Sequence, residues 1–154
     1  MNARFRYALD PILLTRQWSL NALLVELGEC NEKIALEEKN LALLKEKVNT
    51  AYAEWQALSN VAQVVSVQRF AMHNNYIGDL LTQVKKLELH IEQQNKERDE
   101  LIEKVVAAQR AVEAVEQHRD EMKARFVKLR LSGDFKIADD QWNTIQAGMV
   151  SNGS

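Results

Sequence analysis

Two series of apolar residues recur every seven positions, one in each half of the chain. The first comprises Leu13, Leu20, Leu27, Ile34, Leu41, Val48 and Trp55, accompanied three residues later by Leu23, Cys30, Leu44, Ala51 and Leu58. The second comprises Phe70, Ile77, Val84, Ile91, Val105, Val112 and Phe126, with Arg98 and Arg119 at the two intervening positions of the repeat, accompanied by Leu80, Leu87, Leu101, Ala108, Val115, Met122 and Leu129. A seven-residue repeat sustained this long is typical of coiled-coil helices. The pattern therefore predicts an all-α fold, a long two-helix antiparallel coiled-coil hairpin.

The ends of the two helices are predicted from the residues that start and stop helices. Pro11 suits the first turn of a helix and Asp10 is a candidate N-cap. Ser132 and Gly133 form a candidate stop. We therefore expect a hairpin over residues 1–131, with helix 1 over about 11–59, a tip over about 60–67 and helix 2 over about 68–131. Residues 132–154 form a C-terminal extension with a short helix and a partly disordered end.

Composition agrees with a single helical domain. The chain has 154 residues, of which 27% are charged, and only five glycines and one proline. So few turn-forming residues cannot support a sheet or a globule of many elements. Because one hairpin buries both apolar series within one chain, we expect a monomer, and a self-associating filament is disfavoured.

Charged residues inside the apolar series leave two registers open. In one, Leu58 lies opposite Phe70. A shift by one heptad instead places Glu37 beside Arg98, as an ion pair that would fix the register. Alternatively, the long charged side chains reach out to water from the seam, which is the apolar face that the two series form. In that case neither charge needs a partner.

Several classes of site are excluded by what the sequence lacks. The sequence has no run of about 18 apolar residues that could span a membrane, and its N-terminal residues do not resemble a signal peptide. The chain has no Gly-rich phosphate loop, and His73, His90 and His118 lack the spacing of a metal site. Cys30 is interpreted as a small core residue in a reducing compartment. We expect no catalytic, metal or cofactor-binding residues, and hence no enzyme, no cofactor and a cytoplasmic location.

Cations gather at the open end of the predicted hairpin, where both chain ends meet. The docking candidates are Arg4, Arg6, Arg16, Lys123, Arg125, Lys128 and Arg130, with Arg119 nearby. Part of this charge favours the C-terminal end of helix 2 through the helix dipole. The remainder suits an acidic protein partner. Nucleic acid is disfavoured, because the net charge is −2 and no basic groove studded with aromatic residues is evident.

The predicted tip is unusually apolar for an exposed loop. The candidate contacts with a partner are Val61, Val64, Val65, Val67, Met72 and Tyr76. Either these residues fold back and cap the coiled coil, or they bind a partner protein.

The C-terminal extension also allows two interpretations. Asp139 or Asp140 could cap a short helix with Trp142, Ile145 and Met149 along one face. This helix either packs back on the open end, near Leu14 and Trp18, or orders on a partner. Packing back is favoured, and residues 151–154 are expected to be disordered.

Residues 5–16, FRYALDPILLTR, together with two long heptad helices, resemble the FliJ-like proteins and their virulence counterparts of the YscO type. Both have an aromatic and apolar segment that runs into a leucine-rich helix start. The likeness covers about 130 residues in pattern and about a dozen in detail. Residues 17–20, QWSL, and the C-terminal extension depart from the flagellar pattern, which favours a virulence-type secretion system over a flagellum.

This resemblance implies a stalk component of a type III protein export apparatus, cytoplasmic and peripheral to its membrane-embedded part. The open end would enter a hexameric export ATPase, and the other end would reach toward the membrane export gate protein. The family is also associated with secretion chaperones. The alternative function is therefore a coiled-coil adaptor or escort that binds such chaperones without entering the ring.

Overall fold

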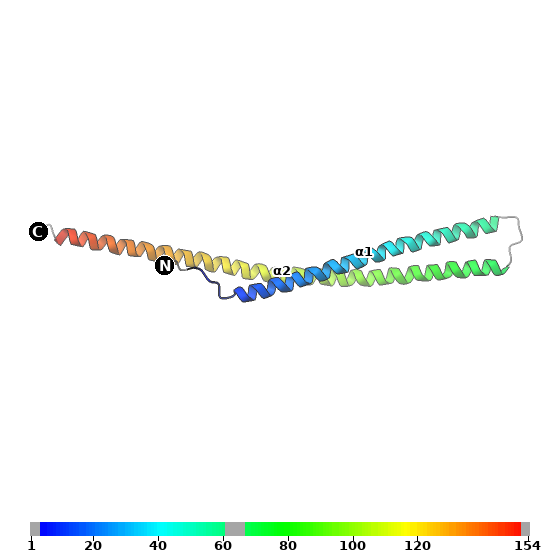
Figure 1. The fold of residues 1–154 in the computed structure, drawn as a ribbon, viewed down its shortest axis with the longest axis horizontal. Coiled ribbons are helices and arrows are strands. Elements are labelled where there is room, and N and C mark those ends of the chain that lie inside the picture. Colours follow the sequence, from blue (N-terminus) through cyan, green and yellow to red (C-terminus); the bar gives the residue numbers. More distant parts are fainter. Residues whose placement is uncertain (1–3, 61–66, 152–154) are drawn as a thin grey trace. The chain divides into compact units, whose positions relative to one another are not determined.

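The computed structural model describes residues 4–60 and 67–151, and this part of the chain forms two α-helices (Figure 1). Helix α1 spans Asp10–Asn60 and contains 51 residues, whereas α2 spans Val67–Ser151 and contains 85. The described residues include no strand. The all-α prediction is confirmed, and three of the four predicted helix ends lie within one residue of the observed ones.

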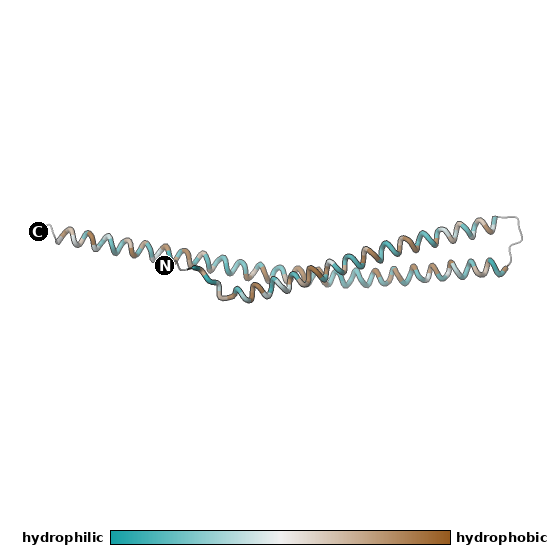
Figure 2. Tube along the Cα trace, in the orientation of Figure 1, coloured by the Kyte–Doolittle hydropathy of each residue, from teal (hydrophilic) through white to brown (hydrophobic). Residues whose placement is uncertain are grey.

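The helices contribute to two compact units, and each unit contains a piece of α1 and a piece of α2. Unit 1 combines residues 1–20 with 107–154, and unit 2 comprises residues 21–106. Along both helices, hydrophobic and hydrophilic residues alternate at short intervals (Figure 2). This alternation is what allows each helix to bury one face and leave the other in water.

In unit 2 the two helical segments run antiparallel. Glu54 near the end of α1 lies 3.9 Å from His73 near the start of α2, measured between Oε2 and Nε2. Further from the tip, Lys45 Nζ lies 3.3 Å from Glu88 Oε1. Seam residues form the core between these two helical segments, and Ala51 among them is only 2% exposed. The buried cluster comprises Val48, Ala51, Ile77 and Leu80, and the residues packed against it are Leu44, Trp55 and Val84. The predicted seam is therefore the buried face in this unit.

The register of unit 2 excludes the Glu37–Arg98 layer. The thiol of Cys30 lies 4.0 Å from the backbone oxygen of Gln94. Seven residues further along α1, Glu37 is opposite about residue 87 in an antiparallel pair. Arg98 instead lies 3.2 Å from Asp99 Oδ1, its neighbour in sequence. The heptad-shifted register was wrong, because Arg98 is partly exposed and satisfied by an adjacent carboxylate.

The observed register is close to the other predicted one. Trp55 packs against Phe70 with ring centroids 6.3 Å apart and an interplanar angle of 83°. Leu58, which was predicted opposite Phe70, lies one seam position further along α1. Cys30 is half-buried in the seam, in agreement with its interpretation as a small core residue.

The predicted end of helix 2 at residue 131 was wrong, because α2 continues through Ser132 and Gly133 to Ser151. Glycine stops a helix when it adopts a positive φ, and no described glycine does so. A helical glycine costs only about 1 kcal/mol relative to alanine. Since propagation adds hydrogen bonds without a new nucleus, α2 extends past this weak signal.

The expected short helix that packs back on the open end is also not what the structure shows. Residues 127–150 are all exposed, and they belong to α2 itself. The seam prediction fails here too, since Met122 is 38% and Leu129 is 74% exposed. Helix α1 begins at Asp10 and offers no residue opposite these positions. Of the segment predicted to be disordered, Ser151 ends α2, and residues 152–154 lie outside the described residues.

Neither α1 nor α2, over the residues given above, is long and apolar enough to cross a bilayer.

Candidate partner-docking surfaces

The open end of unit 1 is held together by a short non-helical segment that precedes α1. Tyr7 is buried, and its hydroxyl forms a hydrogen bond with Nδ1 of His118 on α2. Phe5 packs on Phe126 with ring centroids 5.6 Å apart. Tyr7 also belongs to a buried cluster with Leu13, Val112 and Val115. Sequence periodicity missed these contacts because residues 4–9 have no helical repeat, although two aromatic residues two positions apart suit one side of an extended segment.

The contact between Phe5 and Phe126 brings cations from the two ends of the sequence together. Arg4 and Arg6 flank Phe5, and Arg125 precedes Phe126. All seven predicted docking cations are exposed and belong to unit 1. We refer to them as the basic end: Arg4, Arg6, Arg16, Lys123, Arg125, Lys128 and Arg130.

Arg16, a member of the basic end, has a structural contact with α2. The guanidinium of Arg16 donates a hydrogen bond of 3.1 Å from Nη1 to the backbone oxygen of Ala111. Nearby, Arg119 Nε lies 3.5 Å from Asp120 Oδ1. Arg16 therefore helps to join α1 to α2, and its charge is partly engaged before any partner binds.

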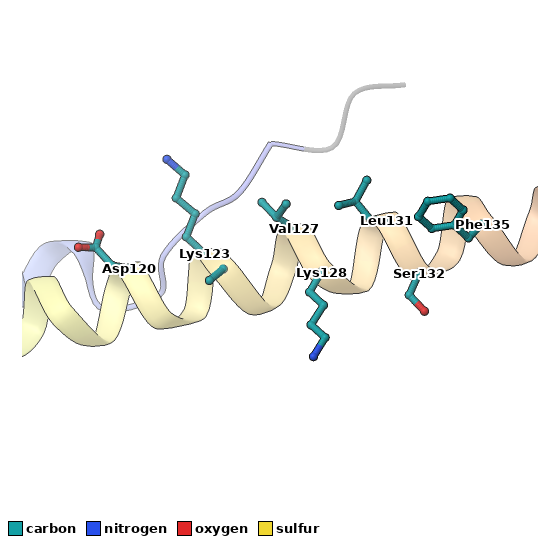
Figure 3. Close-up of a pocket in the computed structure, with 8 residues that line it drawn as sticks. Asp120, Lys123, Val127, Lys128, Leu131, Ser132 and Phe135 are labelled. Atoms are coloured by element: carbon teal, nitrogen blue, oxygen red, sulfur yellow. The ribbon is translucent and has the colours of Figure 1, made fainter.

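A shallow groove runs along α2 beside the basic end. Figure 3 shows Val127, Leu131 and Phe135 on one side of the helix, with Lys123 extending on the same side and Lys128 on the opposite side. The three apolar residues are at least 46% exposed. Sequence reasoning did not identify this groove, although the spacing of four between its apolar residues is a detectable helical signal.

The predicted tip is only partly described. Val61, Val64 and Val65 lie outside the described residues. Val67 begins α2 and is 85% exposed, and Met72 is 72% exposed. Met72 and Tyr76 line a shallow groove together with Leu58 of α1. These two candidate residues are therefore brought together on the surface of unit 2, outside the buried seam.

Over residues 4–60 and 67–151, no three side chains of His, Cys, Asp or Glu are grouped as metal ligands would be. His73 lies beside Glu54 and His118 beside Tyr7, so each has a partner in the fold.

Comparison with known proteins adds no identity. No protein-family description, curated protein or solved structure matches this chain.

Proposed function

We propose that this chain is a non-enzymatic stalk protein of a type III export apparatus, of the FliJ-like or YscO type. The basic end docks in a hexameric export ATPase, and the tip reaches the membrane export gate protein. Two observations support this proposal. Residues 5–16 resemble the start of those proteins, and α1 and α2 pair antiparallel within each unit.

The assembled basic end is the observation that carries the proposal. Cations that are more than 100 positions apart in the sequence are joined by the Phe5–Phe126 and Tyr7–His118 contacts. A surface built from the segment before α1 and from a distant part of α2 is held at a fixed geometry, which a solvated terminus alone would lack. Such a cluster favours an acidic protein surface, because charge complementarity raises the encounter rate and sets orientation.

Docking through exposed cations also fits a stalk that acts without chemistry of its own. The sequence has no phosphate-binding loop, so the chain would influence ATP hydrolysis only through its partner. A stalk that binds one arrangement of the ring subunits more tightly than the others increases the population of that arrangement. Increased hydrolysis or ring assembly is the expected consequence.

Charge reversal at the basic end tests this function. We expect the triple variant Arg4→Glu, Arg6→Glu and Arg125→Glu to lose stimulation of a candidate export ATPase while it retains helicity. The matched control reverses three exposed lysines of unit 2, namely Lys39, Lys85 and Lys86. Equal stimulation by both variants at physiological salt would contradict docking through the basic end.

A chaperone-binding adaptor is the second candidate, and the groove at Val127, Leu131 and Phe135 is the observation that favours it. Exposed apolar side chains of this size commonly anchor protein interfaces. The two functions differ in one measurement. An adaptor binds a secretion chaperone without changing ATP hydrolysis, whereas a stalk changes hydrolysis in the absence of any chaperone.

A further inference from the structure

Helix α2 carries a second apolar face beyond the one that packs on α1. Between residues 124 and 149, apolar side chains recur at spacings of three and four. At about 100° per residue they fall within an arc of about 80° on the helix surface. We call this set the second stripe: Ala124, Val127, Leu131, Phe135, Ala138, Trp142, Ile145 and Met149.

The second stripe does not continue the seam that is buried elsewhere in α2. That seam passes through Phe126 and, at the next two heptads, through Gly133 and Asp140. It therefore loses its apolar residues where the second stripe begins. The two faces lie about 160° apart around the helix, given about 3.6 residues per turn.

Every member of the second stripe is exposed in the structure. Phe135 is 70%, Trp142 is 59% and Ile145 is 52% exposed. A periodic apolar face of this length is unusual on a surface that meets only water. Spacings of three and four residues are also those that pack against another helix.

Two carboxylates flank the apolar part of the second stripe that follows Leu131. Asp134 lies on one edge of the stripe and Asp139 on the other, as their positions on the helical wheel require. Lys136 projects from a different face, more than a quarter turn from either edge. The edges of this segment therefore favour cations on whatever covers it.

A second copy of this chain does not meet that requirement. In a parallel pair, residues five positions apart on facing edges oppose each other, which sets Asp134 of one copy against Asp139 of the other. In an antiparallel pair centred near the middle of the segment, Asp139 faces its own counterpart. Like charges in these positions disfavour self-association.

We infer that the part of the second stripe that follows Leu131 binds an amphipathic helix of a partner protein, with apolar residues at heptad spacing and lysine or arginine along both edges. Such helix-on-helix recognition uses the apolar face for affinity and the edge charges for orientation. This part of the stripe follows the basic end, whose Lys123 and Lys128 line the groove at Val127 and Leu131. The inference does not rest on the proposed function, since it needs no export ATPase.

Synthetic helices test this inference with the full chain. The probe is a peptide of about three heptads with leucine at the a and d positions and lysine at the e and g positions. The comparison peptide has glutamate in place of every lysine. We expect the lysine peptide to bind at least about tenfold more tightly than the glutamate peptide, measured by titration calorimetry.

Two variants of the chain locate the binding surface. Trp142→Ala with Ile145→Ala should weaken binding of the lysine peptide about tenfold or more, because both are exposed anchors. Leu36→Ala with Leu89→Ala is the matched control, since these leucines are 59% and 58% exposed on other faces, and it should bind as the original chain does. Helicity of both variants checks that each is folded.

Charge exchange decides the chemistry of the partner. Asp134→Lys with Asp139→Lys should reverse the preference and favour the glutamate peptide. The inference is overturned if the stripe variant binds the lysine peptide unchanged, or if the charge exchange leaves the preference unaltered. It is also overturned if sedimentation shows a dimer of the original chain that Trp142→Ala with Ile145→Ala dissociates, because a second copy is then the occupant.

Discussion

Tyr7 and His118, which are 111 positions apart in the sequence, are joined by a hydrogen bond and by rings whose centroids are 5.6 Å apart. Tyr7 precedes α1, so this pair ties a non-helical segment to α2. The same segment carries Arg4 and Arg6 of the basic end. The contact of Tyr7 with His118 therefore fixes the segment that carries these two arginines.

Removing the hydroxyl and removing the ring of Tyr7 should have different costs. Tyr7→Phe keeps the packing against Leu13 and Val112, and we expect it to lower the free energy of unfolding by about 0.5–1.5 kcal/mol. Tyr7→Ala also empties part of a buried cluster, with an expected loss of about 3–5 kcal/mol. Urea denaturation followed by circular dichroism measures both changes.

The control for these variants is Trp18→Ala, since Trp18 is 63% exposed on α1. Its effect should stay within about 0.5 kcal/mol, as for most surface substitutions. If Tyr7→Ala is no more destabilising than Trp18→Ala, the segment before α1 does not contribute to the fold.

The polar seam residue Gln94 offers a stabilising substitution. Its side-chain oxygen Oε1 is buried without a hydrogen-bond partner among the described residues. An unsatisfied buried polar atom costs about 1–3 kcal/mol, and leucine has a similar volume and suits a seam position. We therefore expect Gln94→Leu to raise the free energy of unfolding by about 1 kcal/mol, measured by urea denaturation.

The neighbouring Gln93 is exposed, which makes Gln93→Leu the matched control. This substitution should leave the midpoint of denaturation nearly unchanged, because it buries no surface in the seam. A decrease in stability for Gln94→Leu would show that the amide is satisfied in solution.

Helical periodicity predicted the hairpin well because it reports burial directly. Ala51, Ile77 and Val112 occupy predicted seam positions and are buried. The same logic failed at Leu129, which is apolar and in phase but has no helix opposite it. Periodicity identifies a face that can be buried, whereas its partner is set by where the other helix begins.

The candidate docking surfaces were predictable to different degrees. The basic end followed from antiparallel pairing, since that topology brings Arg6 and Arg125 to the same end. The aromatic contacts that fix it did not follow, because the geometry of a non-helical segment is decided by tertiary packing. The groove at Leu131 and Phe135 was hidden by the assumption that Gly133 ends the helix.

Substitution of Gly133 tests whether α2 is continuous, because alanine should stabilise a continuous helix and destabilise one that ends at this residue. Gly133 has no positive φ, and a Cβ added there meets nothing within 4 Å. Gly133→Ala should therefore stabilise local helix by about 0.5–1 kcal/mol and increase amide protection around residues 130–140. A helix that ended here with glycine at positive φ would instead be destabilised by alanine.

Gly28→Ala provides the comparison, because Gly28 lies within α1 in equally open space. Both substitutions should increase helicity measured by circular dichroism. Loss of protection at residues 134–145 in Gly133→Ala alone would contradict a continuous α2.

At the tip, exposed apolar residues should matter for binding and not for folding. Val67 and Met72 are 85% and 72% exposed, so Val67→Ser with Met72→Ser removes little buried surface. We expect the melting temperature to change by less than about 2 °C, since surface substitutions are usually within about 0.5 kcal/mol. Under the proposed function, the same variant should lose its contact with a candidate export gate protein, measured by surface plasmon resonance.

Val48→Ser is the control, because Val48 is buried in the seam and its loss should lower the melting temperature instead. A tip variant that melts like the original chain and binds the gate protein with full affinity would end the docking role of these residues, and a large fall in its melting temperature would assign them to capping the coiled coil.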